Sequence, residues 1–150
     1  MATTKYNGKS IQELAGYTDS IRITHADLTA SATSETITKT VKAGQQVRGV
    51  AFKVHTAFDG GSTSALKLDV GDGDDADGYI DNEEIHVDAT EVLFGPALDG
   101  LLTGKTYAAD DTIDILFSAT GANVSELDAG EVEIFFNIIS LNDVSADFAG

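Results

Sequence analysis

The chain contains no cysteine and no tryptophan, and none of its apolar runs is long. Without cysteine there is no disulfide framework, no thiolate nucleophile and no cysteine metal site. A membrane helix needs about 20 apolar residues, whereas the longest apolar run here, Ile134 to Leu141, is interrupted by Asn137 and Ser140. The first ten residues, MATTKYNGKS, also lack the charged-then-apolar layout of a secretory signal, so we expect no export by a signal-peptide route.

Basic residues are scarce, and they are almost confined to the first half of the chain. The 9 Lys and Arg against 25 Asp and Glu give a formal net charge of −16. Residues 1–68 carry 8 basic and 5 acidic side chains, a net charge of +3, whereas residues 69–150 carry 1 basic and 20 acidic, a net charge of −19. Such a surface repels phosphate backbones and anionic membranes. We therefore expect neither nucleic acid nor a membrane as partner, although acidic side chains also serve solubility alone.

What the sequence does contain is a two-residue alternation of apolar and polar residues from residue 20 onward, which is typical of half-buried β-strands. The alternating segments lie at residues 20–24, 36–41, 50–55, 66–70, 113–118 and 131–138, with residues 79–87 and Tyr107 as further candidates. Glycine-containing turns such as Asp59-Gly60-Gly61 and Asp77-Gly78 separate them. This pattern predicts an all-β protein, a jelly-roll-like antiparallel β-sandwich of about eight strands.

The two ends of the chain differ from this alternating part. Residues 1–19 read as an N-terminal arm in which the capping box Ser10 to Glu13, with Gly16 as a stop, predicts one short helical turn. A helix this short is marginal by itself, so we expect the arm to order only against another surface. Residues 20–142 form the predicted β-sandwich domain, and residues 143–150 form a short acidic C-terminal tail.

The last predicted strand, EIFFNIISL, is apolar on both faces, because Phe135 and Ile139 oppose Ile134, Phe136 and Ile138. A strand of this kind is covered on both sides. Two explanations remain open, a central position in the fold or burial under a neighbouring subunit.

The strongest local signal for a bound ion is the acidic stretch from Val70 to Glu84, VGDGDDADGYIDNEE. Aligned on Gly78 as the glycine of a calcium loop, its candidate ligands for Ca²⁺ are Asp75, Asp77, the carbonyl of Tyr79, Asp81 and Glu84. The first ligand position is occupied by Gly73, where the motif requires Asp, and the flanks read as strands. The stretch therefore predicts either a Ca²⁺ site or a solvated acidic hairpin loop.

No pattern in the sequence indicates catalysis. The three histidines are far apart, and no His-x-His or His-Glu-x-x-His spacing occurs. G-x-S-x-G, P-loop and dinucleotide-binding glycine motifs are also missing. Carboxylates are so abundant that a pair of them is no evidence for glycosidase chemistry, and the tryptophan platforms common in carbohydrate clefts are absent. We therefore expect a protein that is not an enzyme.

Four segments of the chain share a distinctive order of strands and turns: the run from Thr24 to Asp59, which includes SATSETITKTVKAGQQVRGVAFKV, then GDGDDADGYID, YAADDTIDILF and LDAGEVEIFFNIISLN. Together they resemble the decoration or cement proteins that coat the capsids of tailed bacteriophages. The resemblance covers roughly residues 20–142 and consists of strand and turn patterns.

The resemblance implies a jelly-roll structural protein of the virion, located on the outer capsid surface, where it bridges neighbouring major capsid proteins and stabilises the shell. It further implies a homo-oligomer, with a trimer favoured over a dimer. The alternative function is a calcium-dependent receptor- or glycan-binding domain of a head fibre or tail component, acting through the Asp72–Glu84 loop.

Overall fold

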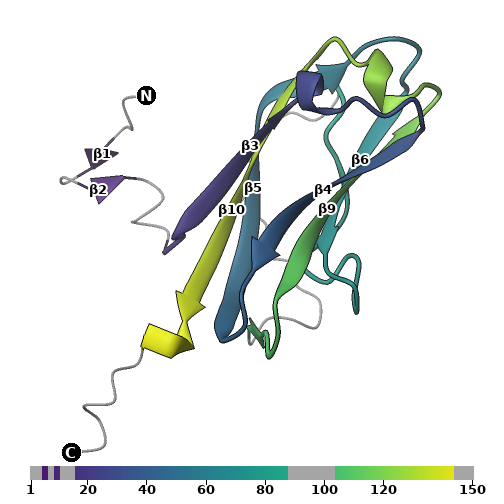
Figure 1. Ribbon diagram of the computed structural model, residues 1–150. Helices are drawn as coiled ribbons and strands as arrows, with labels where there is room; N and C mark the ends of the chain where they lie inside the picture. Colours follow the sequence, from purple (N-terminus) through teal and green to yellow (C-terminus); the bar gives the residue numbers. More distant parts are fainter. Residues whose placement is uncertain (1–4, 7–8, 11–15, 88–103, 144–150) are drawn as a thin grey trace, which may run out of the picture.

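The computed structural model describes residues 5–6, 9–10, 16–87 and 104–143, and most of them lie in strands (Figure 1). The strands are β1 (Lys5–Tyr6), β2 (Lys9–Ser10), β3 (Asp19–Thr24), β4 (Ser34–Val41), β5 (Gln45–Asp59), β6 (Ala65–Gly71), β7 (Ile80–Glu84), β8 (Lys105–Thr106), β9 (Asp111–Thr120) and β10 (Ala129–Ser140). Three short 3₁₀ turns accompany them: η1 (His25–Asp27), η2 (Val124–Glu126) and η3 (Leu141–Asp143).

Eight of these strands build two four-stranded antiparallel sheets, in the orders β3-β10-β5-β8 and β4-β9-β6-β7. The pairing is nested: β3 pairs with β10, β4 with β9, β5 with β8 and β6 with β7. The chain is thus one long hairpin wrapped so that successive pairs alternate between the two sheets. This is the jelly-roll topology, and the prediction of an all-β jelly-roll-like sandwich of eight strands is confirmed.

The alternation of each strand decides which face lies inside. In β9 the side chains of Ile113, Ile115 and Phe117 are fully buried, and Asp114 between them is directed outward. The rings of Phe58 from β5 and Phe117 from β9 lie 6.1 Å apart and so join the two sheets through the core. Burial of these apolar side chains supplies the main driving force that holds one sheet against the other.

Strand β10 occupies a central position in its sheet. It pairs with β3 on one side and with β5 on the other, and its register with β5 extends from Ala129 to Ser140. Its inward side chains, including Ile134 and Phe136, are fully buried. The sandwich core therefore covers the inner face of this strand, whereas on the outer face Phe135 is half-buried against Tyr17 and Ile139 is half-buried. Burial of the outer face under a neighbouring subunit stays a prediction.

Hydrogen bonds and the last elements show where the described sandwich begins and ends. The hydroxyl of Thr18 donates to the carbonyl of Ile138, so contacts with the sandwich begin just before residue 20. At the other end β10 stops at Ser140 and Asp143 closes η3, so the sandwich includes the first residue of the predicted tail. In the arm, β1 pairs with β2, whereas the predicted helical turn and the remainder of the tail fall largely outside the described residues.

A glycine sets the packing where β10 begins. Gly130 has a φ of 136°, and a Cβ atom added to it would lie 2.2 Å from the ring of Phe58. We expect Gly130→Ala to lower the free energy of unfolding by about 2–4 kcal/mol, because it combines backbone strain with overpacking. Urea unfolding measures the change.

Gly49 is the matched control, because a Cβ atom added there meets no atom within 4 Å. Gly49→Ala should leave stability unchanged or raise it by up to about 1 kcal/mol. Equal losses in the two variants would contradict this account of Gly130.

Candidate interaction surface

The charged residues are divided unequally between the two sheets. The strands of the β3-β10-β5-β8 sheet carry 4 basic and 4 acidic residues, a net charge of 0. The strands of the β4-β9-β6-β7 sheet carry 2 basic and 7 acidic residues, a net charge of −5. The loop between β6 and β7 adds four further aspartates to the second sheet. We call the first sheet the neutral sheet and the second the acidic sheet.

Each sheet contains strands from both halves of the sequence. The neutral sheet combines β3 and β5 from the first half with β8 and β10 from the second half. The charge asymmetry of the sequence halves is therefore not the asymmetry of the molecule. The fold converts it into a difference between two faces.

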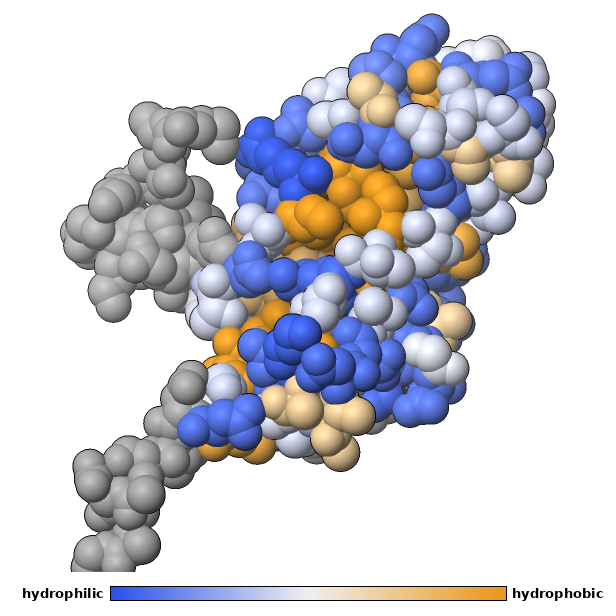
Figure 2. Space-filling view, in the orientation of Figure 1, coloured by the Kyte–Doolittle hydropathy of each residue, from blue (hydrophilic) through white to orange (hydrophobic). Residues whose placement is uncertain are grey.

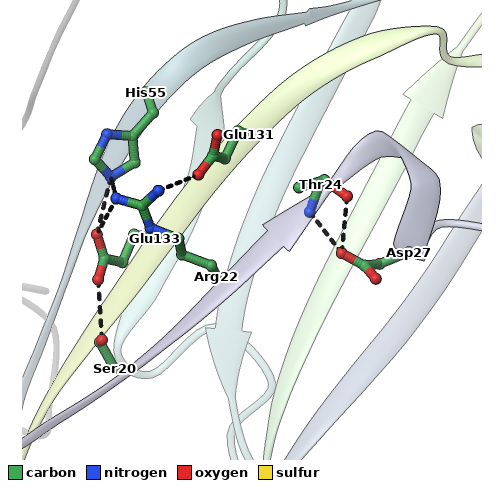
Figure 3. Close-up of polar contacts among 7 residues, drawn as sticks. All are labelled: Ser20, Arg22, Thr24, Asp27, His55, Glu131 and Glu133. Carbon is green, nitrogen blue, oxygen red and sulfur yellow. Dashed lines mark hydrogen bonds and ion pairs between the residues drawn. The ribbon is translucent and has the colours of Figure 1, made fainter. Parts of the chain in front are cut away.

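A cluster of ion pairs covers part of the outer face of the neutral sheet (Figure 3). The Arg22 guanidinium on β3 contacts the carboxylate of Glu131 at 2.5 Å and that of Glu133 at 3.5 Å, both on β10. Glu133 also binds Nε2 of His55 at 2.9 Å and accepts a hydrogen bond from the Ser20 hydroxyl at 3.0 Å. These contacts tie three neighbouring strands together.

The ion pairs determine the protonation of Glu133. Partial burial by itself would raise the pKa of Glu133, but the hydrogen bonds from His55 and Ser20 and the charge of Arg22 outweigh it and hold the pKa below its usual value. The serine, glutamate and histidine are joined with the carboxylate in the middle. A nucleophilic triad needs the histidine in the middle, beside the hydroxyl, so this cluster holds the serine without activating it.

Next to the ion pairs the same outer face carries an apolar patch. The rings of Tyr17 and Phe135 lie 5.9 Å apart, and Phe135 pairs across the strands with Ala51. Further along this face of β10, Ile139 follows Asn137 and is half-buried. Leu141 comes next in η3, and 42% of its surface is exposed. The neutral sheet thus presents apolar side chains beside balanced charges, a combination found in protein–protein contact surfaces.

On the acidic sheet, the loop between β6 and β7 is built around a buried carboxylate. The side chain of Asp72 is fully buried, and its Oδ2 accepts hydrogen bonds from Lys105 Nζ and from the Tyr107 hydroxyl, both at 2.7 Å. Its Oδ1 accepts the backbone N–H groups of Asp74 at 3.0 Å and Asp75 at 3.1 Å. Each oxygen of Asp72 therefore has hydrogen-bond partners within the protein, and these contacts hold the loop.

The protonation of these groups follows from that network. Burial by itself would raise the pKa of Asp72, but the hydrogen bonds from Lys105, Tyr107 and the loop backbone lower it overall. Burial opposes the charge of Lys105 as well, yet its contacts with Asp72 and Asp74 raise its pKa well above the usual range. Burial and the hydrogen bond to Tyr79 raise the pKa of Tyr107, which remains a neutral donor.

The predicted calcium ligands are not all brought together. The carboxyls of Asp75 and Asp77 contact one another, and this contact raises the pKa of Asp75. The Glu84 carboxylate instead accepts the backbone N–H groups of Leu66 and His86. Tyr79 is buried, and its hydroxyl is hydrogen-bonded to Tyr107. Asp81 is exposed on β7. Within residues 16–87 and 104–143 no group of three or more His, Cys, Asp or Glu is arranged to hold a metal ion, so the Ca²⁺ site stays a prediction.

The three histidines have separate environments. His25 lies in η1 and His55 belongs to the ion pairs of the neutral sheet. His86 is buried at 7% exposure, and its Nε2 atom lies 3.6 Å from Asp59. His86 is therefore enclosed beside the end of β5, where it forms an isolated β-bridge with Phe58.

The residues that hold the acidic loop were not identified from the sequence. One feature of the sequence does point to Lys105 as part of an ion pair, because it is the single basic residue after position 68. A lone cation among 20 acidic residues is expected to be paired, but its partner depends on which strands meet. β8, which contains Lys105, pairs with β5 in the neutral sheet, whereas Asp72 follows β6 in the acidic sheet.

Comparisons with protein-family models, with curated proteins and with solved structures found no match for this chain. In the described part of the chain, no helix has the length and apolar character that crossing a membrane requires.

We expect Lys105→Met to destabilise the protein, because it leaves the buried carboxylate of Asp72 without its cation. The loss should be about 2–3 kcal/mol, the value of a hydrogen bond to a charged group. Lys42→Met is the matched control: Lys42 contacts Asp110 at 2.9 Å, but both side chains are largely exposed. Chemical denaturation gives the free energy of unfolding of both variants. Similar losses would contradict a larger contribution to stability from the buried Asp72 network.

The same network predicts the response to acid. A carboxylate whose pKa is lowered in the folded state stabilises the fold above its unfolded pKa and loses this contribution as the pH falls through the folded pKa. For Asp72 the loss lies below about pH 4. The stability of Asp72→Asn should therefore fall less steeply than that of the wild type in this range, as measured by urea unfolding at a series of pH values.

The melting temperature tests directly whether the acidic loop binds calcium. A cation that binds only the folded protein raises its melting temperature. Because Asp72 already organises the loop, we expect no rise in melting temperature when Ca²⁺ is added to the metal-free protein. A saturable rise that Mg²⁺ does not reproduce would establish the Ca²⁺ site.

Proposed function

We propose that this chain is a structural protein of a tailed-bacteriophage virion that binds the outer surface of the capsid and stabilises it by bridging neighbouring major capsid proteins. The proposal begins with the strand and turn segments that resemble decoration proteins. A protein of this kind needs no active site, only stable surfaces that repeat by symmetry.

The observation that carries the proposal is the difference in charge between the two sheets. One face of the sandwich is neutral and includes the apolar patch around Phe135, whereas the other has a net charge of −5 in its strands. Two unlike faces suit a molecule that lies against an assembly on one side and meets solvent on the other. We assign the neutral sheet to the capsid and the acidic sheet to the outside, where like charge also keeps particles apart.

The alternative, a calcium-dependent receptor- or glycan-binding domain, has less support. It relies on the Asp72–Glu84 loop, whose buried carboxylate is already neutralised by Lys105. The described residues of the loop also present no aromatic platform for a sugar, because Tyr79 is buried.

The protein composition of purified virions tests the proposal. A decoration protein should be present in hundreds of copies per particle, because it follows the capsid lattice, whereas a fibre or tail component is present in few. Quantitative mass spectrometry against the major capsid protein gives the ratio. A ratio far below one copy for each capsomer would contradict a role in decoration.

The assignment of the docking face has its own test. Lys53 on β5 and Lys67 on β6 are half-buried lysines of the neutral and the acidic sheet, respectively. Lys53→Glu should weaken binding to capsids that lack the protein, because it adds negative charge to the contact, and Lys67→Glu should not. Equal binding of the two variants to capsids would contradict the assignment of the neutral sheet as the docking face.

A further inference from the structure

The four strands at the sheet edges differ in how well they are protected against pairing with another chain. On one side of the sandwich, β8 has two residues, and β7 has five with a register shift against β6 and a φ of 54° at Asn82. On the other side, β3 has six residues paired with β10 without a register shift, and β4 has eight residues paired with β9, also without a register shift. Within the described residues β9 is its single partner strand. A long, regular edge strand without proline is a template for pairing with a further strand.

The backbone groups that β4 directs outward can be identified from one hydrogen bond. The amide of Ala119 donates to the carbonyl of Thr33 at 2.7 Å, in the same register that pairs Ser34 with Ser118. In an antiparallel pair, hydrogen-bonded positions alternate with positions whose N–H and C=O groups are directed away. Odd-numbered residues of β4 therefore bond to β9. The even-numbered residues direct their N–H and C=O groups to the open edge, and they are Ser34, Thr36, Thr38 and Thr40.

This parity restricts how a second antiparallel strand can pair with β4. If the partner is β4 of another copy, an even-numbered residue must lie opposite an even-numbered residue, since both must supply outward groups. A register centred on Ile37 meets this condition. It places Ile37 opposite Ile37, Glu35 opposite Lys39, Thr36 opposite Thr38 and Ser34 opposite Thr40, with each unlike pair occurring twice by symmetry.

We propose that two copies of this chain associate through β4 in this register and form a twofold-symmetric dimer with a continuous eight-stranded acidic sheet. The segment Ser34–Thr40, SETITKT, is self-complementary in charge when it is reversed on itself, because Glu35 meets the partner's Lys39 and Lys39 meets the partner's Glu35. Opposite charges, threonine pairs and apolar pairs all stabilise an antiparallel ladder when they lie directly across from one another.

The geometry of the ladder favours the charged and apolar pairs further. The odd-numbered positions are not hydrogen-bonded between the two copies, so their side chains approach more closely than those of the even-numbered positions. The closer positions belong to Glu35, Ile37 and Lys39. The nearest other registers that keep the parity are shifted by two residues and place Glu35 opposite Ile37 or Val41, which loses both charge pairs.

The surroundings of β4 also favour association along this edge. Lys39 is half-buried: it forms an ion pair with Asp19 on β3 and lies 5.2 Å from the centre of the Phe136 ring, so its position is fixed before association. Ile21 and Ile37 are only partly buried against the core. Figure 2 shows an apolar area open to the surface between β3 and β4. A second copy beside β4 would reduce its contact with water.

This inference goes beyond the proposed function and does not depend on the capsid. It gives the homo-oligomer a twofold axis, whereas the resemblance favours a trimer. A twofold contact uses the same patch on both copies and closes by itself.

A charge exchange tests the register. Glu35→Lys places lysine opposite lysine in both symmetric pairs, and Lys39→Glu places glutamate opposite glutamate. Each single variant of the full chain should dimerise at least about tenfold more weakly than the wild type, and the double variant Glu35→Lys/Lys39→Glu should recover most of this loss. Sedimentation equilibrium over a range of protein concentrations gives the dissociation constants, and circular dichroism melting checks that each variant is folded.

A backbone variant tests the strand pairing without changing charge. Thr38→Pro removes an N–H group directed to the open edge, and proline is tolerated in edge strands at such positions. It should therefore abolish dimerisation while the protein stays folded. Thr38→Val is the matched control, because it keeps the N–H group and the shape of the side chain, and it should still dimerise.

The outcomes are distinct. A wild type that sediments as a monomer at every concentration overturns the proposal, and so does a trimer or a dimer that is unaffected by Thr38→Pro. A double variant no better than the weaker single variant overturns the register. Loss of capsid binding has no bearing on these results, because dimerisation is measured with the isolated protein.

Discussion

Every strand of the sandwich depends on the antiparallel pairing of β10 with β5, which joins segments about eighty residues apart in the sequence and extends from Ala129 to Ser140. Because β10 also pairs with β3, the first and last strands of the domain lie side by side in one sheet, with β3 at its edge. The strands β4, β9, β6 and β7 form the second sheet, and each sheet covers the apolar face of the other. Closure of such a long loop costs conformational entropy, and the buried side chains of β10 and β5 offset it.

The acidic loop shows a second constraint, the cost of concentrating negative charge. Four aspartates lie between β6 and β7, and repulsion among them would open an unsupported loop. Asp72 is turned inward and paired with Lys105, so one carboxylate becomes the internal anchor that positions the others. A loop that resembles a cation site by composition thus has a cation of its own, supplied by a side chain from the opposite sheet.

The two faces of the sandwich have different consequences for association. The neutral sheet combines balanced ion pairs around Arg22 with the apolar patch around Phe135, whereas the acidic sheet repels most partners along its face. Its edge is different: β4 contains one Glu and one Lys placed symmetrically about Ile37. The acidic sheet can therefore be extended sideways by a copy of itself while its face stays exposed to solvent. The proposed docking by the neutral face and the proposed association by the β4 edge use separate surfaces and are compatible.

The sequence by itself determined the elements and their inward faces, because the two-residue alternation of segments such as Ile113 to Phe117 is a local property of the chain. It also indicated that the β10 segment is apolar on both faces. It did not determine which strands pair, and hence could not show that Lys105 reaches Asp72, that Glu84 turns to the backbone of Leu66 and away from Asp75, or that His86 is enclosed. Those contacts depend on residues far apart in the chain, and only the nested pairing brings them together. The same pairing decided the distribution of charge, since each sheet takes strands from both halves of an asymmetric sequence.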